Sequence, residues 1–127
     1  MERLDVNLNE VRAFLRAKRD RKQAELADRL RRARADAERI RERIVQEVGP
    51  TRIYQWGSLL NGEHFSEISD IDFALEGLAG PAEYSRALGI AMEETTFPVD
   101  IIDLDKLSCE NRERIVRRGR IVYERRE

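Results

Sequence analysis

Cysteine and histidine are almost missing from the sequence, which has one of each in 127 residues, Cys109 and His64. A single cysteine cannot form an internal disulfide, which fits a reducing compartment, so we expect the protein to be cytoplasmic. The two residues lie far apart in the sequence and give little support for a Cys–His catalytic pair. Their scarcity also leaves no ligand cluster of the kind that favours zinc.

Long apolar runs are also lacking. The chain has no run of eighteen apolar residues, and its N-terminus has no short basic region followed by an apolar stretch. We therefore expect neither a membrane span nor a signal peptide, and no membrane partner. What is present is an apolar content of 41% and a high charged content of 39%, which in 127 residues is enough for one ordinary domain.

The two signs of charge nearly cancel, to a net charge of −1, but they are unevenly distributed. Residues 1–48 carry fourteen Lys/Arg and ten Asp/Glu, whereas residues 49–127 carry ten and fifteen. The excess acid lies largely between Glu63 and Asp105. A domain that concentrates carboxylates often holds a cation, although a solvated acidic face would give the same count.

A long helix is predicted for the N-terminal third of the chain. Apolar residues recur there in steps of three and four, the spacing of one helical face: Leu8, Val11, Leu15, Leu26, Leu30, Ala33, Ala37, Ile40, Ile44 and Val48. No Pro or Gly precedes Gly49, so helix can run from about Asn7 to Glu47, which is roughly 60 Å at 1.5 Å per residue. Because that exceeds the diameter of a small domain, the first half must project or fold back at the basic stretch 16–25.

The first half of that helix predicts a protein partner. Residues 26–48 are expected to pack on the domain of the same chain, whereas the apolar residues within 4–25 need another chain to cover them. The other chain is either a second copy, giving a homo-oligomer, or a different protein, giving a hetero-complex. We do not expect nucleic acid there, because basic and acidic residues alternate closely.

After Gly49-Pro50, which ends the long helix, the pattern indicates strands that alternate with helices. The predicted elements are strands over 52–56, 71–75 and 99–104, helices over 81–95 and 106–118, and an apolar triplet at 121–123. This order indicates an α/β (α+β) fold, in which helices cover a small mixed sheet and the long helix precedes it.

Two aspartates, Asp70 and Asp72, begin the second predicted strand. Side chains alternate along a strand, so both project from one face, with Cα atoms about 7 Å apart. Asp100 lies in the third strand, and neighbouring strands are roughly 4.8 Å apart. If these two strands are neighbours, three carboxylates meet at one point and repel each other unless a cation lies between them. Their oxygens suit a hard divalent cation, so we predict a Mg²⁺ site.

Gly57 and Ser58 supply the second part of the same predicted site. Glycine lets the backbone turn sharply and approach a ligand, and the serine hydroxyl can bond a phosphate oxygen. If a short helix begins at Leu59, its free N–H groups point at the same anion. Metal-binding carboxylates on one side and backbone donors on the other form a site for ATP or another nucleoside triphosphate.

These motifs resemble those of a known family. The similarity to nucleotidyltransferases of the DNA polymerase beta superfamily lies in Gly57-Ser58, eleven intervening residues, Asp70-Ile71-Asp72, and then Val99-Asp100-Ile101. The chain looks most like the minimal nucleotidyltransferases, small proteins usually encoded beside a HEPN-domain partner in prokaryotic toxin–antitoxin pairs. Gly62, Ser69 and the closing segment 118–124 also look like that family.

The resemblance implies a nucleotidyltransferase fold over residues 38–127, with residues 1–37 as an N-terminal helical extension. It also implies an enzyme that acts as an antitoxin, by moving AMP from ATP to a tyrosine of a HEPN ribonuclease toxin. Residue by residue, it assigns catalysis and the binding of two Mg²⁺ ions to Asp70, Asp72 and Asp100, and nucleotide binding to Gly57, Ser58 and Ser69.

One departure from the family leaves a second functional class open. Many relatives have an arginine between the Gly-Ser pair and the following glycine, where this chain has Leu59-Leu60-Asn61. Loss of that cation would weaken triphosphate binding. The alternative function is a binding module, weakly active or inactive, that neutralises its partner by covering it.

Overall fold

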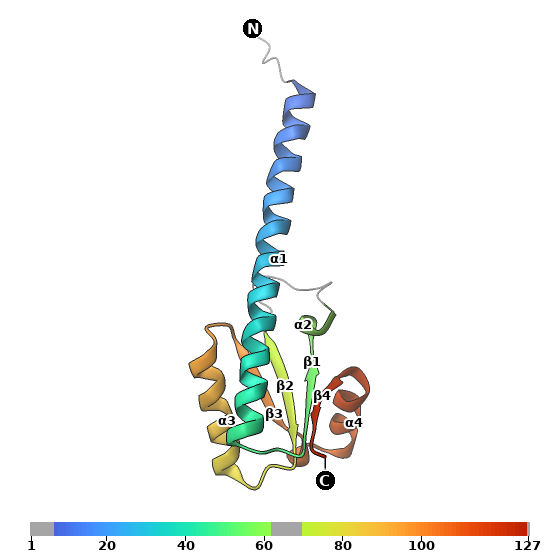
Figure 1. Cartoon of the computed structure of the whole chain (residues 1–127). Coiled ribbons are helices and arrows are strands. Elements are labelled where there is room, and N and C mark those ends of the chain that lie inside the picture. Colours follow the sequence, from blue (N-terminus) through green and yellow to red (C-terminus); the bar gives the residue numbers. More distant parts are fainter. Residues whose placement is uncertain (1–6, 62–69, 127) are drawn as a thin grey trace.

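A single long helix, α1 (Leu8–Glu47), sets the shape of the molecule (Figure 1). The structure, a computed structural model, describes residues 7–61 and 70–126. Asn7 caps α1, since its side chain accepts hydrogen bonds from the backbone N–H groups of Asn9 and Glu10. The predicted helix from about Asn7 to Glu47 is therefore confirmed, and it projects from the domain without folding back.

The second half of α1 packs on the sheet, as the apolar spacing predicted. Its buried residues are Ala33, Ala37, Ile40 and Ile44, and Leu30 packs partly against the same core. The helix runs without a break across residues 37 and 38, so the division of the chain at that point stays a prediction. Among the residues described, no helix is both long and apolar enough to cross a membrane.

The sheet has four strands in the order β3-β2-β1-β4. They are β1 (Arg52–Trp56), β2 (Ile71–Glu76), β3 (Val99–Asp103) and β4 (Arg120–Glu124). Strands β2 and β3 are parallel, and the other two pairs are antiparallel. A parallel pair needs a crossover, which is supplied by α3 (Pro81–Glu94). The α/β (α+β) class with a small mixed sheet is confirmed.

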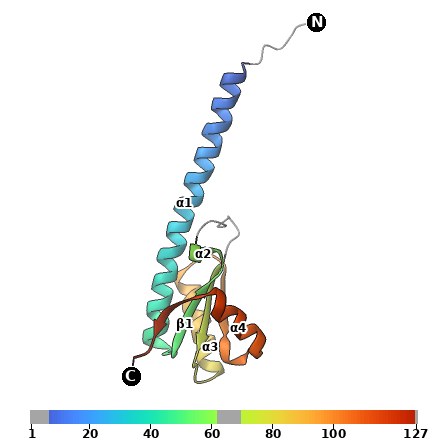
Figure 2. The ribbon, with the colours of Figure 1, turned by 90° about the vertical axis from the view of Figure 1, so that its right-hand side faces the viewer.

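Helices lie on both faces of this sheet (Figure 2). On one face α1 and α3 cover the larger core, which contains Ile53, Phe73 and Ile101. On the other face Tyr54 and Ala74 form a smaller core, which packs against α4 (Cys109–Arg118). Because side chains alternate along each strand, neighbouring residues in the sequence belong to opposite cores.

The predicted helix over 106–118 is wrong at its start. A 3₁₀ turn, η1 (Leu104–Lys106), follows β3, and α4 begins only at Cys109. Two caps explain the difference. The Asp103 side chain accepts from the backbone N–H of Asp105, and the Ser108 hydroxyl accepts from that of Asn111. Each capping side chain begins its own short element.

Candidate active site

Strand pairing brings two of the three predicted carboxylates side by side. Strands β2 and β3 are neighbours, and their register places Asp72 directly opposite Asp100. Adjacent residues of a parallel pair project from the same face, with backbones roughly 4.8 Å apart. Asp72 is 8% exposed, whereas Asp100 is open to solvent. One carboxylate is therefore buried beside another that molecules in solution can reach.

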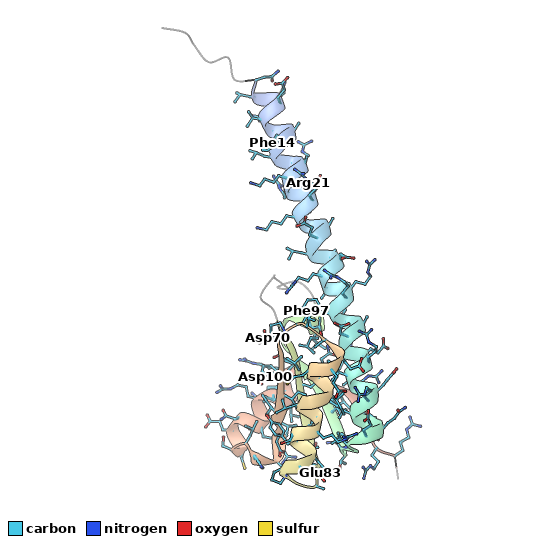
Figure 3. The ribbon with its side chains drawn as sticks, turned by 90° about the vertical axis from the view of Figure 1, so that its left-hand side faces the viewer. Phe14, Arg21, Asp70, Glu83, Phe97 and Asp100 are labelled. Atoms are coloured by element: carbon cyan, nitrogen blue, oxygen red, sulfur yellow. The ribbon has the colours of Figure 1, made fainter. Side chains whose placement is uncertain are left out.

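Asp70 lies immediately before β2, at the same end of the sheet. It lies two positions before Asp72, with only Ile71 between them, so by strand alternation it projects towards the same face. Figure 3 shows Asp70 and Asp100 near one another at the end of the domain from which α1 projects. Asp70 is half-buried. The structure thus places Asp70, Asp72 and Asp100 at one end of the sheet, and their meeting at a single cation-binding point stays a prediction.

The surroundings of Asp72 destabilise its charged form. Burial raises the pKa of Asp72 from its ordinary 3.8 to about 6, and the negative charges of Asp70 and Asp100 add to the shift. At the opposite end of β2, Glu76 forms ion pairs with Arg52 and Arg112 at 3.2 and 2.9 Å. Among the residues described, no arginine or lysine forms such a pair with Asp72. Within residues 7–61 and 70–126, no cation therefore compensates its charge.

Gly57 holds the backbone directly against Asp72. It follows β1 with φ of 83°, a left-handed conformation that favours glycine, and a Cβ at this position would collide with Oδ2 of Asp72. The helix α2 (Ser58–Asn61) begins at the next residue, one residue earlier than the predicted start at Leu59. Gly57 therefore allows the turn into α2 and leaves room for the carboxylate.

Two of the predicted nucleotide-binding groups cannot be placed. The side chain of Ser58 and the whole of Ser69 lie outside the described residues. Their contacts with a phosphate stay predictions. Trp56, the last residue of β1, pairs with Asp72 in the antiparallel register, and its buried Nε1 has no hydrogen-bond partner among the residues described.

The three carboxylates have the oxygen ligands that Mg²⁺ prefers, but their side chains are not arranged to coordinate one ion. Burial is the first cause of the raised pKa of Asp72, and repulsion by Asp70 and Asp100, which a cation would remove, adds to it. Within residues 7–61 and 70–126, however, no group of three or more Asp, Glu, His or Cys side chains is in position to hold a metal ion. Asp70 and Asp100 would have to turn towards Asp72 to coordinate one.

We predict that Asp72 lowers stability as the pH rises, if divalent cations are removed. Its folded-state pKa of about 6 lies above the ordinary 3.8, so the folded state favours the protonated form. The stability that this proton supplies is complete below about pH 4 and is lost as the pH rises through about 6. Asp72→Asn, which mimics the protonated carboxyl, should match the wild type at pH 4 and exceed its free energy of unfolding by about 1–2 kcal/mol at pH 7, a value reduced for solvent screening.

Urea unfolding of both proteins at the two pH values, with a chelator present, measures this difference. If the free energies of unfolding of Asp72→Asn and the wild type differed by the same amount at pH 4 and at pH 7, ionisation of Asp72 would not destabilise the fold. That result would contradict the prediction.

The sequence reasoning missed a groove on the opposite face of the sheet. This groove, of about 800 Å³, lies between α1, α2 and β4. Arg34, Arg41 and Arg120 contribute to its lining. The available signal was the seven-residue spacing of Arg34 and Arg41, which places both on one side of a helix.

The chain was compared with family models and with curated proteins. No family model matches it, and no curated protein matches it either. The resemblance to the minimal nucleotidyltransferases therefore depends on the motifs quoted above.

Proposed function

We propose that the protein is a nucleotidyltransferase, which moves a nucleoside monophosphate from a nucleoside triphosphate to a hydroxyl. AMP from ATP is the first candidate. The observation that carries the proposal is the pairing of Asp72 with Asp100, with Gly57 packed against the Asp72 carboxylate. Such a site needs carboxylates that bind a metal and a turn whose backbone binds phosphate. A buried and an exposed carboxylate beside a tight turn into a helix would supply both parts.

Each carboxylate has a role that follows from its position. Asp70 and Asp72 would bind Mg²⁺ ions, with Asp100 as a further ligand. When bound, such ions neutralise charge on the phosphates and on the departing pyrophosphate. Asp100 is exposed, so it can approach the acceptor hydroxyl and accept its proton. The backbone of Gly57, and the predicted contacts of Ser58 and Ser69, would hold the triphosphate.

The acceptor we propose is a tyrosine of a HEPN-domain ribonuclease, which the modification would silence. The resemblance to minimal nucleotidyltransferases supports this choice. The exposure of Asp100 at the end of the sheet is compatible with a side chain presented by another protein. The protein would then act as the antitoxin of a toxin–antitoxin pair.

A specific observation supports the alternative, a module that neutralises its partner by covering it. Where many relatives have an arginine, this chain has Leu59, which is buried at 1% exposure, and Leu60, which is half-buried. These positions contribute packing rather than a cation. Triphosphate binding would then depend on the metal ions, on backbone N–H groups and on the predicted contacts of Ser58 and Ser69, without an arginine at these positions.

One experiment separates the two functions. The protein is incubated with Mg²⁺, with ATP labelled on the α-phosphate, and with the product of the neighbouring gene. Transfer predicts covalent label on that product, together with loss of its ribonuclease activity. Loss of ribonuclease activity without label would contradict transfer and favour the binding module.

A further inference from the structure

The face of α1 that packs on the sheet continues along the projecting half of the helix. At 3.6 residues per turn, Leu8 lies about ten turns from the buried Ile44, and Leu15 lies about five turns from the buried Ala33. Each pair therefore shares one side of the helix. Leu8, Val11 and Leu15 are nonetheless 65%, 40% and 53% exposed. They form an apolar stripe that nothing in the described chain covers.

A row of arginines, which we call the arginine edge, lies beside this stripe. Some of its members line the groove. The groove of about 800 Å³ has apolar residues in its lining, which include Ala37, Leu59 and Phe73. Arg34 donates from Nε and Nη2 to the carbonyl of Leu59 at 3.3 Å. Arg41 donates from Nη1 to the carbonyl of Val122 at 3.3 Å. Each guanidinium has five N–H donors, so these bonds fix both side chains and leave donors for a ligand.

The same edge continues onto the projecting half of α1. Arg12 lies about eight turns from Arg41, and Arg19 lies about four turns from Arg34, so these residues share one side of the helix. Arg16 is one turn from Arg12 on that side. We define the arm–groove surface as the stripe Leu8, Val11 and Leu15 with the edge Arg12, Arg16, Arg19, Arg34, Arg41 and Arg120.

Charge argues against a second copy as the occupant of this surface. The segment from Arg16 to Lys22 has five cations and one carboxylate. Parallel pairing of two copies would place this segment against itself. Antiparallel pairing, with Leu8 and Leu15 against Leu26 and Leu30 of the other copy, would also place the two basic segments against each other. Opposed cations at this density destabilise a helix pair.

We propose that the arm–groove surface binds an acidic amphipathic segment of a different protein. Apolar side chains of that segment would cover the stripe, and its carboxylates would pair with the arginine edge. Arginine forms bidentate hydrogen bonds with carboxylates, and exposed apolar faces of helices are a common mode of segment recognition. Glu38 is the carboxylate that lines the groove, and it already pairs with Arg41 at 3.7 Å.

This inference does not depend on the proposed enzyme activity. Gln55 and Phe73 line the groove, whereas their neighbours Trp56 and Asp72 project from the opposite face of the sheet. Changes on the arm–groove surface should therefore leave the carboxylate site unchanged.

The test uses the full chain and a fluorescent peptide built from Leu-Glu-Glu-Leu-Leu-Glu-Glu repeats. Fluorescence anisotropy should show saturable binding that weakens as salt is added. Leu8→Ser with Leu15→Ser, and separately Arg12→Glu with Arg34→Glu, should each weaken binding by about tenfold or more. Arg21→Glu is the control, because Arg21 lies about two and a half turns from Arg12 and therefore on the other side of α1.

Three results would overturn the proposal. The first is no binding of the peptide, or an equal loss of binding in Arg21→Glu. The second is tighter binding of a short single-stranded RNA through the same arginines, which would make the surface a nucleic-acid site. The third is a dimer in sedimentation velocity that the Leu8→Ser, Leu15→Ser variant abolishes, which would make a second copy the occupant. Unchanged thermal midpoints of the variants show that the fold is intact.

Discussion

Replacing Asp72 with asparagine is expected to reduce the proposed nucleotidyl transfer by about a hundredfold to a thousandfold. The change removes one negative charge from the carboxylate that lies between Asp70 and Asp100, and so the site loses much of its attraction for divalent cations. Losses of this size are typical when one preorganised charged group is removed from a reacting site. The rate of label transfer from ATP to the acceptor protein measures the effect.

The matched control is Asp103→Asn, which makes the same chemical change on the same strand as Asp100. Asp103 pairs with Leu75 in the sheet register and caps η1, a task that asparagine also performs. Its variant should keep the wild-type rate within about twofold. Equal losses in the two variants would mean that acidity in general, and not the Asp72 site, supports the reaction.

Gly57→Ala is expected to damage both the fold and the site. Alanine at a φ of 83° is strained, and its Cβ would displace the Asp72 carboxylate. We expect a loss of about 1–3 kcal/mol in the free energy of unfolding. We also predict that Mg²⁺ raises the thermal midpoint of the wild type and that this rise is lost in the variant. Calorimetric melts with and without Mg²⁺ measure both effects.

Gly77→Ala provides the comparison for that variant. Gly77 has a φ of 80°, and a Cβ there would collide with Thr51, at the far end of β2 from Asp72. This variant should also lose stability, but it should keep its response to Mg²⁺. A Gly57→Ala protein that still responds to Mg²⁺ as the wild type does would contradict the placement of Gly57 at the site.

Much of the fold was predictable because local patterns decide it. The steps of three and four along α1 gave its length and its buried face, and alternation along β2 placed Asp70 and Asp72 on one side. The same alternation turns Asp103 away from Asp100, and its side chain caps a turn. These are consequences of helix and strand geometry, which act within a few residues.

Features that depend on long-range packing were not predictable. The strand order and the register that pairs Asp72 with Asp100 are set by the whole sheet. From the sequence, we could say only that the carboxylates would meet if the two strands were neighbours. The groove joins Arg34 and Arg41 to Arg120, which lies on β4 and far away in the sequence. The start of α4 depends on which polar side chain caps the helix. Asp103 and Ser108 are both residues that can cap a helix, so the sequence alone does not decide between them.

We propose that Asp70, Asp72 and Asp100 together bind a divalent cation beside Gly57. Paramagnetic broadening by Mn²⁺ in the ¹H–¹⁵N NMR spectrum tests it most directly, because the broadening falls steeply with distance from the ion. At substoichiometric Mn²⁺ we predict that the amide signals of Gly57, Ile71 and Ile101 broaden first, and that Asp72→Asn removes the effect. Broadening that begins instead at Glu93 and Glu94 on α3, or that has no preferred location, would contradict the claim.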